Sequence, residues 1–492
     1  MPDNGLGKFF KHSAVYAVGN AANRAGSFLL LPLYTHFLSV EQYGSLELFY
    51  VVSGVVSSVL SVGLAHAALR FYFEYREPAE RNKVISTCLW TTALYSIPAV
   101  FLLSRWNATL SVWIFGDVSY AGAFNLVYAI LVLELMRQIG LAYFRAREYS
   151  TLFVVVSLLQ LVLQVACNVY TVGVRKMGVP GVLTGNLLCV FAGWLFVGAV
   201  VVKECGLSFD GRKMKSIFKY SYPFLFTTIL AVLLQNLDRI TLRAYFSLRE
   251  VGLYALACKF GGLMQDLILE PYNRSFGAYR FTIMRSENAR ELLVKIYSYL
   301  VTGLAFAGLG ITLYSKEVLR LMTEPAYWAA YPLIPLLVLS SIVSGSGYTF
   351  QTGLLYEKKT TYLIPISVAS AAVNVVLYLV LIPRFGMFGA VYAVVTKGII
   401  ETALTYFVSQ RFYSIPYDHL RTAKAVGVTV SLVLLVELLP DSSIVFSLAA
   451  KTMLVLSSIA LYRLVGCLSR QDLDRARGFL STFGRRFLPV GG

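Results

Sequence analysis

Stretches of about twenty apolar residues recur along almost the whole chain, and short polar segments separate them. A helix that crosses a lipid bilayer needs about 20 mainly apolar residues, so each stretch predicts one membrane-spanning helix. The pattern therefore predicts an all-α integral membrane protein with about fourteen such helices. The expected spans are residues 13–37, 46–70, 84–104, 121–143, 151–172, 181–202, 217–244, 251–276, 292–314, 328–354, 362–382, 387–409, 423–439 and 444–465.

Composition supports this interpretation. Hydrophobic residues make up 57% of the chain and charged residues only 14%. Soluble domains carry about 25% charged residues. The longest polar loops have about 20 residues, which is too few for an independently folded soluble domain. We therefore expect a membrane protein that is not an enzyme with a separate catalytic domain.

Lysine and arginine give the chain a net charge of +17, and their distribution predicts its orientation. With the N-terminus in the cytoplasm, 30 of them fall in cytoplasmic segments and 10 in external segments. Cytoplasmic loops of membrane proteins carry such an excess of Lys and Arg. We therefore expect a multi-pass protein of the inner membrane with both termini cytoplasmic, and no nucleic-acid partner.

Neither the cysteines nor the histidines predict a metal site or a cofactor. The six cysteines form no CxxC pair, and we expect free thiols. The four histidines are scattered without the spacing of metal ligands. The sequence contains no phosphate-binding P-loop motif.

Two pairs of glycine motifs recur at one offset and predict an internal repeat. Tyr43-Gly44 follows the first expected helix, and Val251-Gly252 lies 208 residues further along. Gly181 and Gly389, near the starts of the sixth and twelfth helices, are also 208 residues apart. Two six-helix lobes in a parallel repeat are typical of alternating-access transporters. The expected domains are an N-terminal lobe (1–206), a C-terminal lobe (207–415), an extra helix pair (416–466) and a basic cytoplasmic tail (467–492).

Polar and ionisable side chains inside the expected spans are the candidate functional residues. A charge at the bilayer centre costs about 2.5–3.5 kcal/mol, so it is expected to face water, a substrate or another charge. Asn20 and Arg24 share one polar face of the first helix, and the planar guanidinium of Arg24 suits a phosphate. The candidate substrate-binding residues are Arg24, Asn20, Arg239, Lys259 and Lys397, and the candidate ion-coupling residues are Asp266, Glu270, Asp238, Glu401 and Glu134.

Structural roles stay open for several of these residues. Arg24 is either a substrate contact or the partner of an acidic residue on another helix. Lys397 and Glu401, one helical turn apart, either line a lumen or neutralise each other. Arg137, close to Glu134, either joins the lumen or extends to the membrane surface. Acidic residues of the lumen can bind a coupling H⁺ or Na⁺, and no other cofactor is expected.

Three short motifs occur in order along the first twelve expected helices. They are Leu31-Pro32-Leu33 to Leu38-Ser39 running into Tyr43-Gly44, Leu237-Asp238-Arg239 followed by Val251-Gly252-Leu253-Tyr254, and Ile382-Pro383-Arg384-Phe385-Gly386 running into Gly389-Ala390. Together they resemble the Wzx-type oligosaccharide flippases of the MOP (multidrug/oligosaccharidyl-lipid/polysaccharide) exporter superfamily.

The resemblance implies a MATE-like fold whose two lobes enclose a central cationic cavity. It also implies alternating-access transport of an undecaprenyl-diphosphate-linked oligosaccharide, for the assembly of O-antigen, exopolysaccharide or capsule. The implied partners are this lipid-linked oligosaccharide, membrane lipids, and a polysaccharide polymerase with its chain-length machinery.

Three other functions compete with this one. A cation-coupled multidrug exporter of the same superfamily is expected to have a mainly acidic lumen, whereas the first helix has Arg24 and no carboxylate. Lipid II flippases also have fourteen helices, but this chain lacks their clustered arginines in the first helices. A membrane-embedded glycan polymerase is expected to have a larger extramembrane loop.

Overall fold

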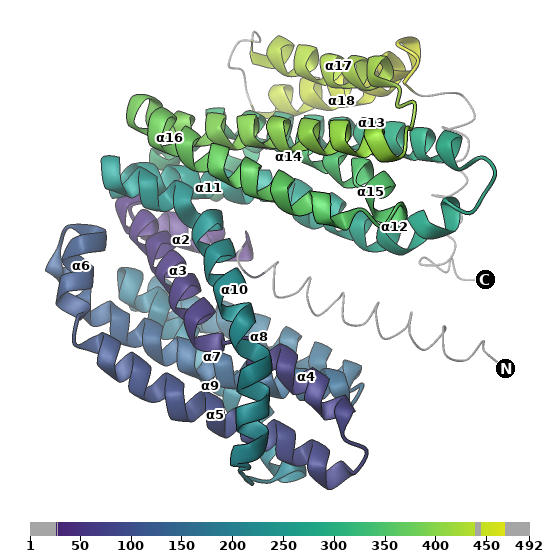
Figure 1. Ribbon diagram of the computed structural model, residues 1–492. Coiled ribbons are helices and arrows are strands. Elements are labelled where there is room, and N and C mark those ends of the chain that lie inside the picture. Colours follow the sequence, from purple (N-terminus) through teal and green to yellow (C-terminus); the bar gives the residue numbers. More distant parts are fainter. Residues whose placement is uncertain (1–25, 27, 438–443, 468–492) are drawn as a thin grey trace, which may run out of the picture. The chain divides into compact units, whose positions relative to one another are not determined.

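The computed structural model describes residues 26, 28–437 and 444–467, and these residues form helices and connections without a strand (Figure 1). They divide into two compact units. The first comprises the described residues up to Ala255 together with Met322–Tyr327, and the second comprises Leu256–Leu321 and the described residues from Trp328 onward. The predicted all-α class is confirmed.

The first unit contains the helices of the N-terminal half and the start of α11. They are α2 (Leu31–Phe37), α3 (Val40–Ser61), α4 (Leu64–Glu74), α5 (Pro78–Ser104), α6 (Asn107–Phe115), η1 (Val118–Tyr120), α7 (Ala121–Ala146), α8 (Ser150–Asn168), η2 (Val169–Val174), α9 (Gly178–Cys205), α10 (Gly211–Tyr245) and α11 (Leu248–Met264).

The second unit contains the rest of α11 and most of the later helices. They are η3 (Gln265–Leu269), α12 (Glu270–Ile283), α13 (Ala289–Met322), η4 (Pro325–Leu333), α14 (Ile334–Phe350), α15 (Thr352–Tyr356), η5 (Thr360–Tyr362), α16 (Leu363–Phe412), α17 (His419–Glu437) and α18 (Ile444–Leu464).

Eleven helical segments of the described residues are long and apolar enough to cross a membrane. Three of the expected spans account for the difference between these eleven segments and the fourteen that the sequence predicts. The first expected span, 13–37, lies mostly outside the described residues. The helical stretch 248–283 is absent from the eleven because it carries several charged side chains. The segment Thr360–Phe412 counts once but contains two expected spans, which a kink at Gly386, with a φ of 57°, separates within α16.

The first unit packs its long helices around an apolar core. α7 contacts both α5 and α9, and Ile85, Phe144 and Val201 lie in the core between them. α10 runs beside α3 and α4 (Figure 1). This packing places α10 in the first unit, although we expected it to begin the C-terminal lobe at residue 207. That lobe boundary stays a prediction.

Sequence signals set the starts of α3 and α10. Ser39 and Gln42 form a capping box, in which each side chain accepts a hydrogen bond from the other residue's amide at 3.2 and 3.1 Å. Asp210 precedes α10, and its carboxylate accepts the amides of Arg212 and Lys213 at 2.9 and 3.2 Å. These side chains satisfy amides that the first turn of a helix leaves without a partner.

The first glycine pair of the predicted repeat forms a direct contact in the first unit. A Cβ on Gly44 would lie 1.9 Å from the carbonyl oxygen of Leu248, and one on Gly252 would lie 2.4 Å from that of Val40. Leu248 lies 208 residues after Val40, as Gly252 does after Gly44, so the contact is reciprocal. Only glycine allows α3 and α11 to approach this closely.

A pair of hydrogen bonds in the same unit follows the same offset. The hydroxyl of Thr35 donates to the carbonyl oxygen of Met322 at 2.8 Å, and Nε of Arg243 donates to that of Ile114 at 2.9 Å. Arg243 lies 208 residues after Thr35, and Met322 lies 208 residues after Ile114. The repeat in the sequence therefore corresponds to repeated local structure.

A left-handed glycine precedes both the sixth and the twelfth expected span. Gly178 has a φ of 62°, and Gly386, 208 residues later, has a φ of 57°. A residue with a side chain is strained in this conformation. The backbone therefore favours glycine at equivalent positions of the two repeats.

In the second unit, α17 and α18 pack on α13 (Figure 1). Nζ of Lys451 on α18 lies 2.6 Å from Oε1 of Glu317 on α13, and only 5% and 9% of these two side chains is exposed. The hydroxyl of Thr429 on α17 bonds that of Tyr462 on α18 at 2.6 Å. The extra helix pair is thus attached by a buried ion pair as well as by apolar contacts.

Candidate functional site

The candidate site residues fall into three groups. Asn20 and Arg24 lie outside the described residues, so their role stays a prediction. The other eight are described, three in the first unit and five in the second. They are Glu134, Asp238 and Arg239, then Lys259, Asp266, Glu270, Lys397 and Glu401.

Glu134 is the acceptor of an ion pair on α7. Nε and Nη2 of Arg137 donate to its two carboxylate oxygens at 2.9 and 2.8 Å. Nη1 of Arg137 donates to Oε1 of Gln160 on α8 at 2.8 Å. Arg137 is only 8% exposed, so it lies between helices and does not extend to the membrane surface. A carboxylate held by a two-pronged arginine contact favours a structural role for Glu134, and ion coupling there stays a prediction.

Asp238 and Arg239 belong to a polar cluster between α10 and α11. The hydroxyl of Tyr254 donates to Oδ2 of Asp238 at 2.7 Å, and the main-chain amide of Arg239 donates to Oδ1 at 2.7 Å. Nη1 of Arg239 lies 3.6 Å from the same Oδ1. Arg239 also interacts electrostatically with Tyr43 of α3. The structure therefore brings these two candidates together beside the glycine contact of the repeat.

Asp266 lies in η3, a π-helical turn between α11 and α12. Such turns are rare and occur frequently at functional sites. The Asp266 side chain is exposed in the second unit, although the residue falls in the middle of the expected span 251–276. Glu270 follows one turn later, with its Oε2 3.2 Å from Nη2 of Arg274. Lys259, on α11, is half-buried. A continuous helical stretch thus carries three of the candidates.

Lys397 and Glu401 form an ion pair on α16. The mutual neutralisation that we considered for this pair therefore occurs. Each side chain is still 35% exposed, and both residues lie well inside the expected span 387–409. A charged pair at this depth that keeps part of its surface open suits contact with water or a polar substrate better than contact with lipid tails.

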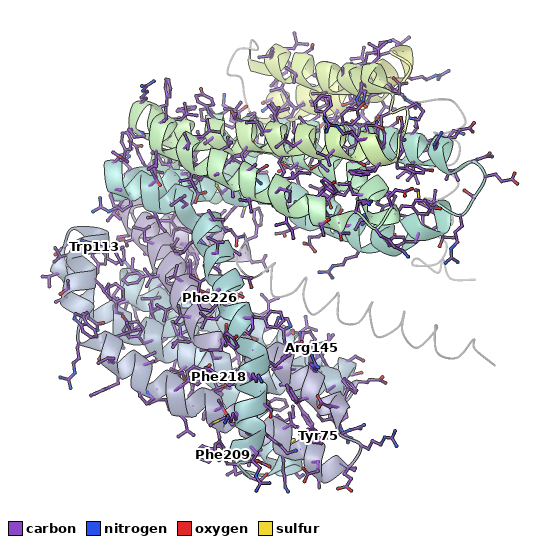
Figure 2. All side chains as sticks on the ribbon, viewed as in Figure 1. Tyr75, Trp113, Arg145, Phe209, Phe218 and Phe226 are labelled. Carbon is purple, nitrogen blue, oxygen red and sulfur yellow. The ribbon has the colours of Figure 1, made fainter. Side chains whose placement is uncertain are left out.

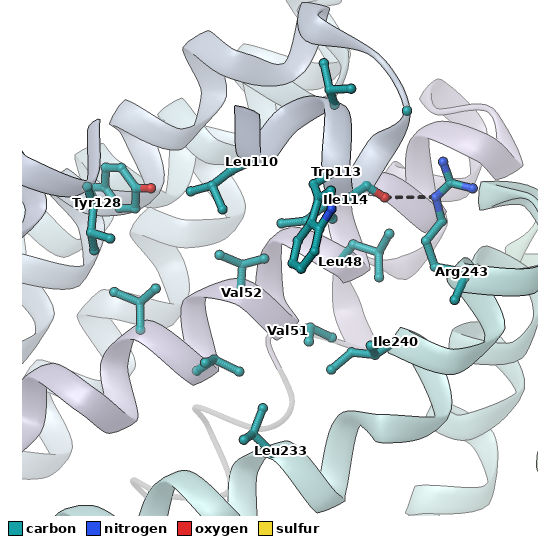
Figure 3. Close-up of a pocket in the computed structure, with 16 residues that line it drawn as sticks. Leu48, Val51, Val52, Leu110, Trp113, Ile114, Tyr128, Leu233, Ile240 and Arg243 are labelled. Carbon is teal, nitrogen blue, oxygen red and sulfur yellow. Dashed lines mark hydrogen bonds between the residues drawn. The ribbon is translucent and has the colours of Figure 1, made fainter. Parts of the chain in front are cut away.

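Sequence reasoning missed an apolar groove in the first unit (Figure 3). Sixteen residues line a cavity of about 700 Å³ between α3, α6, α7 and α10, and we call it the α3–α10 groove. Leu48 and Val52 of α3 face Leu233 and Ile240 of α10 across it. Arg243 is the one charged residue among the sixteen. In the sequence, Arg243 counts only as an external charge, and nothing there indicates that a cavity lies next to it.

A loop carboxylate near the groove is engaged locally. The hydroxyl and the amide of Ser119 donate to the carboxylate of Asp117 at 2.5 and 3.0 Å, and these bonds lower the pKa of Asp117. No ion pair links Asp117 to Arg243 within the described part of the chain. That part also contains no cluster of three or more His, Cys, Asp or Glu side chains suited to a metal ion.

Comparison with protein families and curated proteins gives one family and two relatives. A family described as "Polysaccharide biosynthesis protein" matches residues 9–274. The "Lsg locus putative protein 1" of Haemophilus influenzae is 23% identical over 290 residues, which cover 57% of this chain and 68% of the relative. An "Uncharacterized membrane protein" of the same organism is 24% identical over 290 residues, with 57% and 67% covered.

Solved structures share the fold. The lipid II flippase MurJ in its inward closed conformation superposes with a TM-score of 0.72 at 13% identity, covering 94% of this chain and 99% of that one. An inward-facing multidrug resistance MATE family transporter of the MOP superfamily gives 0.62 at 13% identity, covering 80% and 97%. The predicted MATE-like fold is confirmed, and the identities are too low to carry more than the fold.

Proposed function

The chain belongs to the polysaccharide biosynthesis protein family and has the fold of MOP-superfamily transporters, and on this basis we propose that it flips a lipid-linked oligosaccharide across the bacterial inner membrane. The substrate is an oligosaccharide on undecaprenyl diphosphate, and transport proceeds by alternating access. The chain moves its substrate without making or breaking a covalent bond.

One observation carries this proposal. The family match covers residues 9–274, and the fold around these residues is shared with a flippase along almost the full length of both chains. The family places the chain in polysaccharide biosynthesis, and the fold is that of a transporter. Together they are best explained by a carrier that moves the lipid-linked intermediate.

Charged side chains within the expected spans support the same proposal. Asp266 is exposed in the second unit, and the Lys397–Glu401 pair keeps about a third of its surface open. Such groups are expected to meet water, a substrate or each other, because lipid tails do not solvate them. Lys397 offers a cation for the diphosphate or for acidic sugars, and Asp266 and Glu270 are the residues proposed to bind the coupling H⁺ or Na⁺.

The likeness to the MATE family transporter supports one alternative, export of cationic drugs by the same fold. The two functions differ in the charge that the carrier must hold. An exporter of cations needs unpaired carboxylates, whereas the carrier of a diphosphate needs cations.

A leaflet-accessibility assay tests the proposal. The purified protein is reconstituted into liposomes with an oligosaccharide on fluorescent undecaprenyl diphosphate, and dithionite is added to quench the outer leaflet. Without protein about half of the signal stays protected, and with protein nearly all of it is expected to become accessible. The Asp266→Asn and Lys397→Ala/Glu401→Ala variants are expected to slow this step.

Three results would contradict the proposal. Release of a shorter or longer glycan without movement of the lipid would indicate an enzyme. Efflux of a cationic dye with no effect on the labelled lipid would indicate a drug exporter. Unchanged protection of the inner leaflet, with protein confirmed to be folded and inserted, would exclude flipping of this substrate.

A further inference from the structure

The α3–α10 groove has the chemical layout of a lipid site. Its walls are mainly aliphatic side chains, many of them from α3 and α10, which are long enough to cross the membrane, and Arg243 lies at one end (Figure 3). Trp113 of α6, which is labelled in Figure 2, also lines the groove, and its side chain is 87% exposed. A cavity of about 700 Å³ with mainly apolar walls and few polar groups is typical of a small-ligand site.

Two backbone carbonyls hold the Arg243 guanidinium in place. Nε donates to the carbonyl oxygen of Ile114 at 2.9 Å, and Nη1 donates to that of Phe246 at 3.1 Å. Nη2 makes no hydrogen bond to the described residues, and no described carboxylate pairs with Arg243. The cation is therefore fixed in position while part of its hydrogen-bonding capacity remains available.

Gly116 keeps Nη2 accessible. This glycine has a left-handed φ of 73°, and a Cβ there would lie 3.1 Å from Nη2 of Arg243. Both its backbone conformation and its lack of a side chain therefore favour the open position of the guanidinium.

A second, independent observation comes from the opposite end of the groove. Tyr128 of α7 is only 3% exposed, and its hydroxyl has no hydrogen-bond partner among the described residues. Figure 3 shows this hydroxyl directed into the groove. A buried hydroxyl without a partner costs about 1–3 kcal/mol, so the described residues alone leave this end of the groove incompletely satisfied.

We propose that the α3–α10 groove binds one anionic phospholipid of the bilayer, with its phosphodiester at Arg243 and an acyl chain along the apolar walls. The single cation matches the single negative charge of a phosphodiester. A diphosphate carries at least two negative charges, and the described residues that line the groove include no second cation to compensate them in a medium of low dielectric constant.

This site is separate from the proposed transport residues and does not depend on the proposed function. None of the eight described candidate residues lines the groove. The bound lipid fills a cavity in the first unit, so it is expected to stabilise that unit against unfolding.

The test measures the unfolding temperature and lipid binding of the full-length protein in neutral detergent. Phosphatidylglycerol is compared with zwitterionic phosphatidylcholine and with glycerol phosphate, which has the head but no chain. The variants are Arg243→Gln, which removes the cation, and Val52→Trp, which fills the groove without touching Arg243. Arg105→Gln is the matched control, because Arg105 is an exposed arginine that does not line the groove.

Phosphatidylglycerol is expected to raise the unfolding temperature of the wild type and of Arg105→Gln, and to leave that of the other two variants unchanged. Native mass spectrometry is expected to show binding to Arg243→Gln weakened by about tenfold or more, since charge-assisted hydrogen bonds are lost. Only protein that elutes at the wild-type volume is compared, so a folding defect does not enter the result.

Several outcomes would overturn the site. Equal stabilisation by phosphatidylcholine or by glycerol phosphate would remove the anionic lipid as the ligand. Full retention of phosphatidylglycerol by Arg243→Gln would remove the cation from the site. Displacement of phosphatidylglycerol by an equimolar undecaprenyl-diphosphate oligosaccharide would assign the groove to the transport substrate instead.

Discussion

Two arginines of the first unit make opposite use of their guanidinium groups. Arg137 directs its donors to Glu134 and Gln160, and it is buried. Arg243 donates to two backbone carbonyls, keeps Nη2 available and borders a cavity. Both lie on helices that are long and apolar enough to cross the membrane. The same residue type therefore stabilises the helix bundle in one place and offers a ligand contact in the other.

The difference shows which intramembrane charges are candidates for function. When all the hydrogen-bond donors of a charged side chain are engaged within the protein, breaking these contacts costs free energy. Such a side chain is expected to hold helices together. A charge that is anchored by only part of its donors, beside an unfilled space, can bind an anion without losing its own support. Substitutions at the two kinds of site should therefore differ in what they impair.

Glu134→Ala is expected to have the largest effect on stability. It leaves the Arg137 cation buried without its carboxylate, and the loss of one partner of a buried pair costs about 3–5 kcal/mol. Unfolding in detergent, followed by tryptophan fluorescence, measures the change. The matched control is Glu270→Ala, because the Glu270–Arg274 pair is partly exposed and such pairs contribute about 0–1 kcal/mol. Similar losses from both variants would contradict the comparison.

Lys451→Met is expected to destabilise by about 3 kcal/mol, somewhat less than Glu134→Ala. Glu317 is then buried without its partner, but a carboxyl can bind a proton and an arginine cannot lose one. The double variant Lys451→Met/Glu317→Leu removes both charges and is expected to recover most of the loss. A double variant that is no more stable than the single one would show that the pair is not the source of the effect.

Arg243→Gln is expected to destabilise by about 1 kcal/mol, because it removes hydrogen bonds to two carbonyls and leaves no buried countercharge. Its main effect is expected on the response to phosphatidylglycerol. Unfolding with and without this lipid separates the two contributions. A loss of several kcal/mol in the absence of lipid would place Arg243 in the same class as Arg137.

Trp113→Ala is expected to change stability by about 0.5 kcal/mol or less, because the side chain is 87% exposed and surface substitutions rarely have larger effects. The same unfolding experiment measures it. A larger loss would mean that Trp113 packs against the groove more tightly than its exposure indicates.

The sequence predicted the fold well, because the features that define it are local or repeated. Apolar stretches identify the spans, and the expected 387–409 helix is visible in α16 after the break at Gly386. The offset of 208 residues identified the repeat, whose glycines Gly44 and Gly252 the structure places in contact. The role of Asn20 and Arg24 depends on residues outside the described part of the chain, and the start of the C-terminal lobe at residue 207 depends on where the lobes divide. Both stay predictions.

The site was predicted only where its contacts are close in the sequence. Lys397 and Glu401 are four residues apart, so their pairing follows from helical geometry. The contact between Arg243 and Ile114 spans 129 residues and depends on how α6 and α10 pack. Helical periodicity carries no information on such packing, and the α3–α10 groove therefore has no signal in a single sequence.

The reciprocal contact of Gly44 and Gly252 has the form found in a symmetric homodimer, where each contact occurs twice with identical residues. Here both copies belong to one chain, so each can change alone. Thr35 and Arg243 occupy equivalent positions and donate to equivalent carbonyls, yet only Arg243 carries a charge. A dimer of identical halves would have to carry such a cation on both sides, whereas a single fused chain can keep it on one.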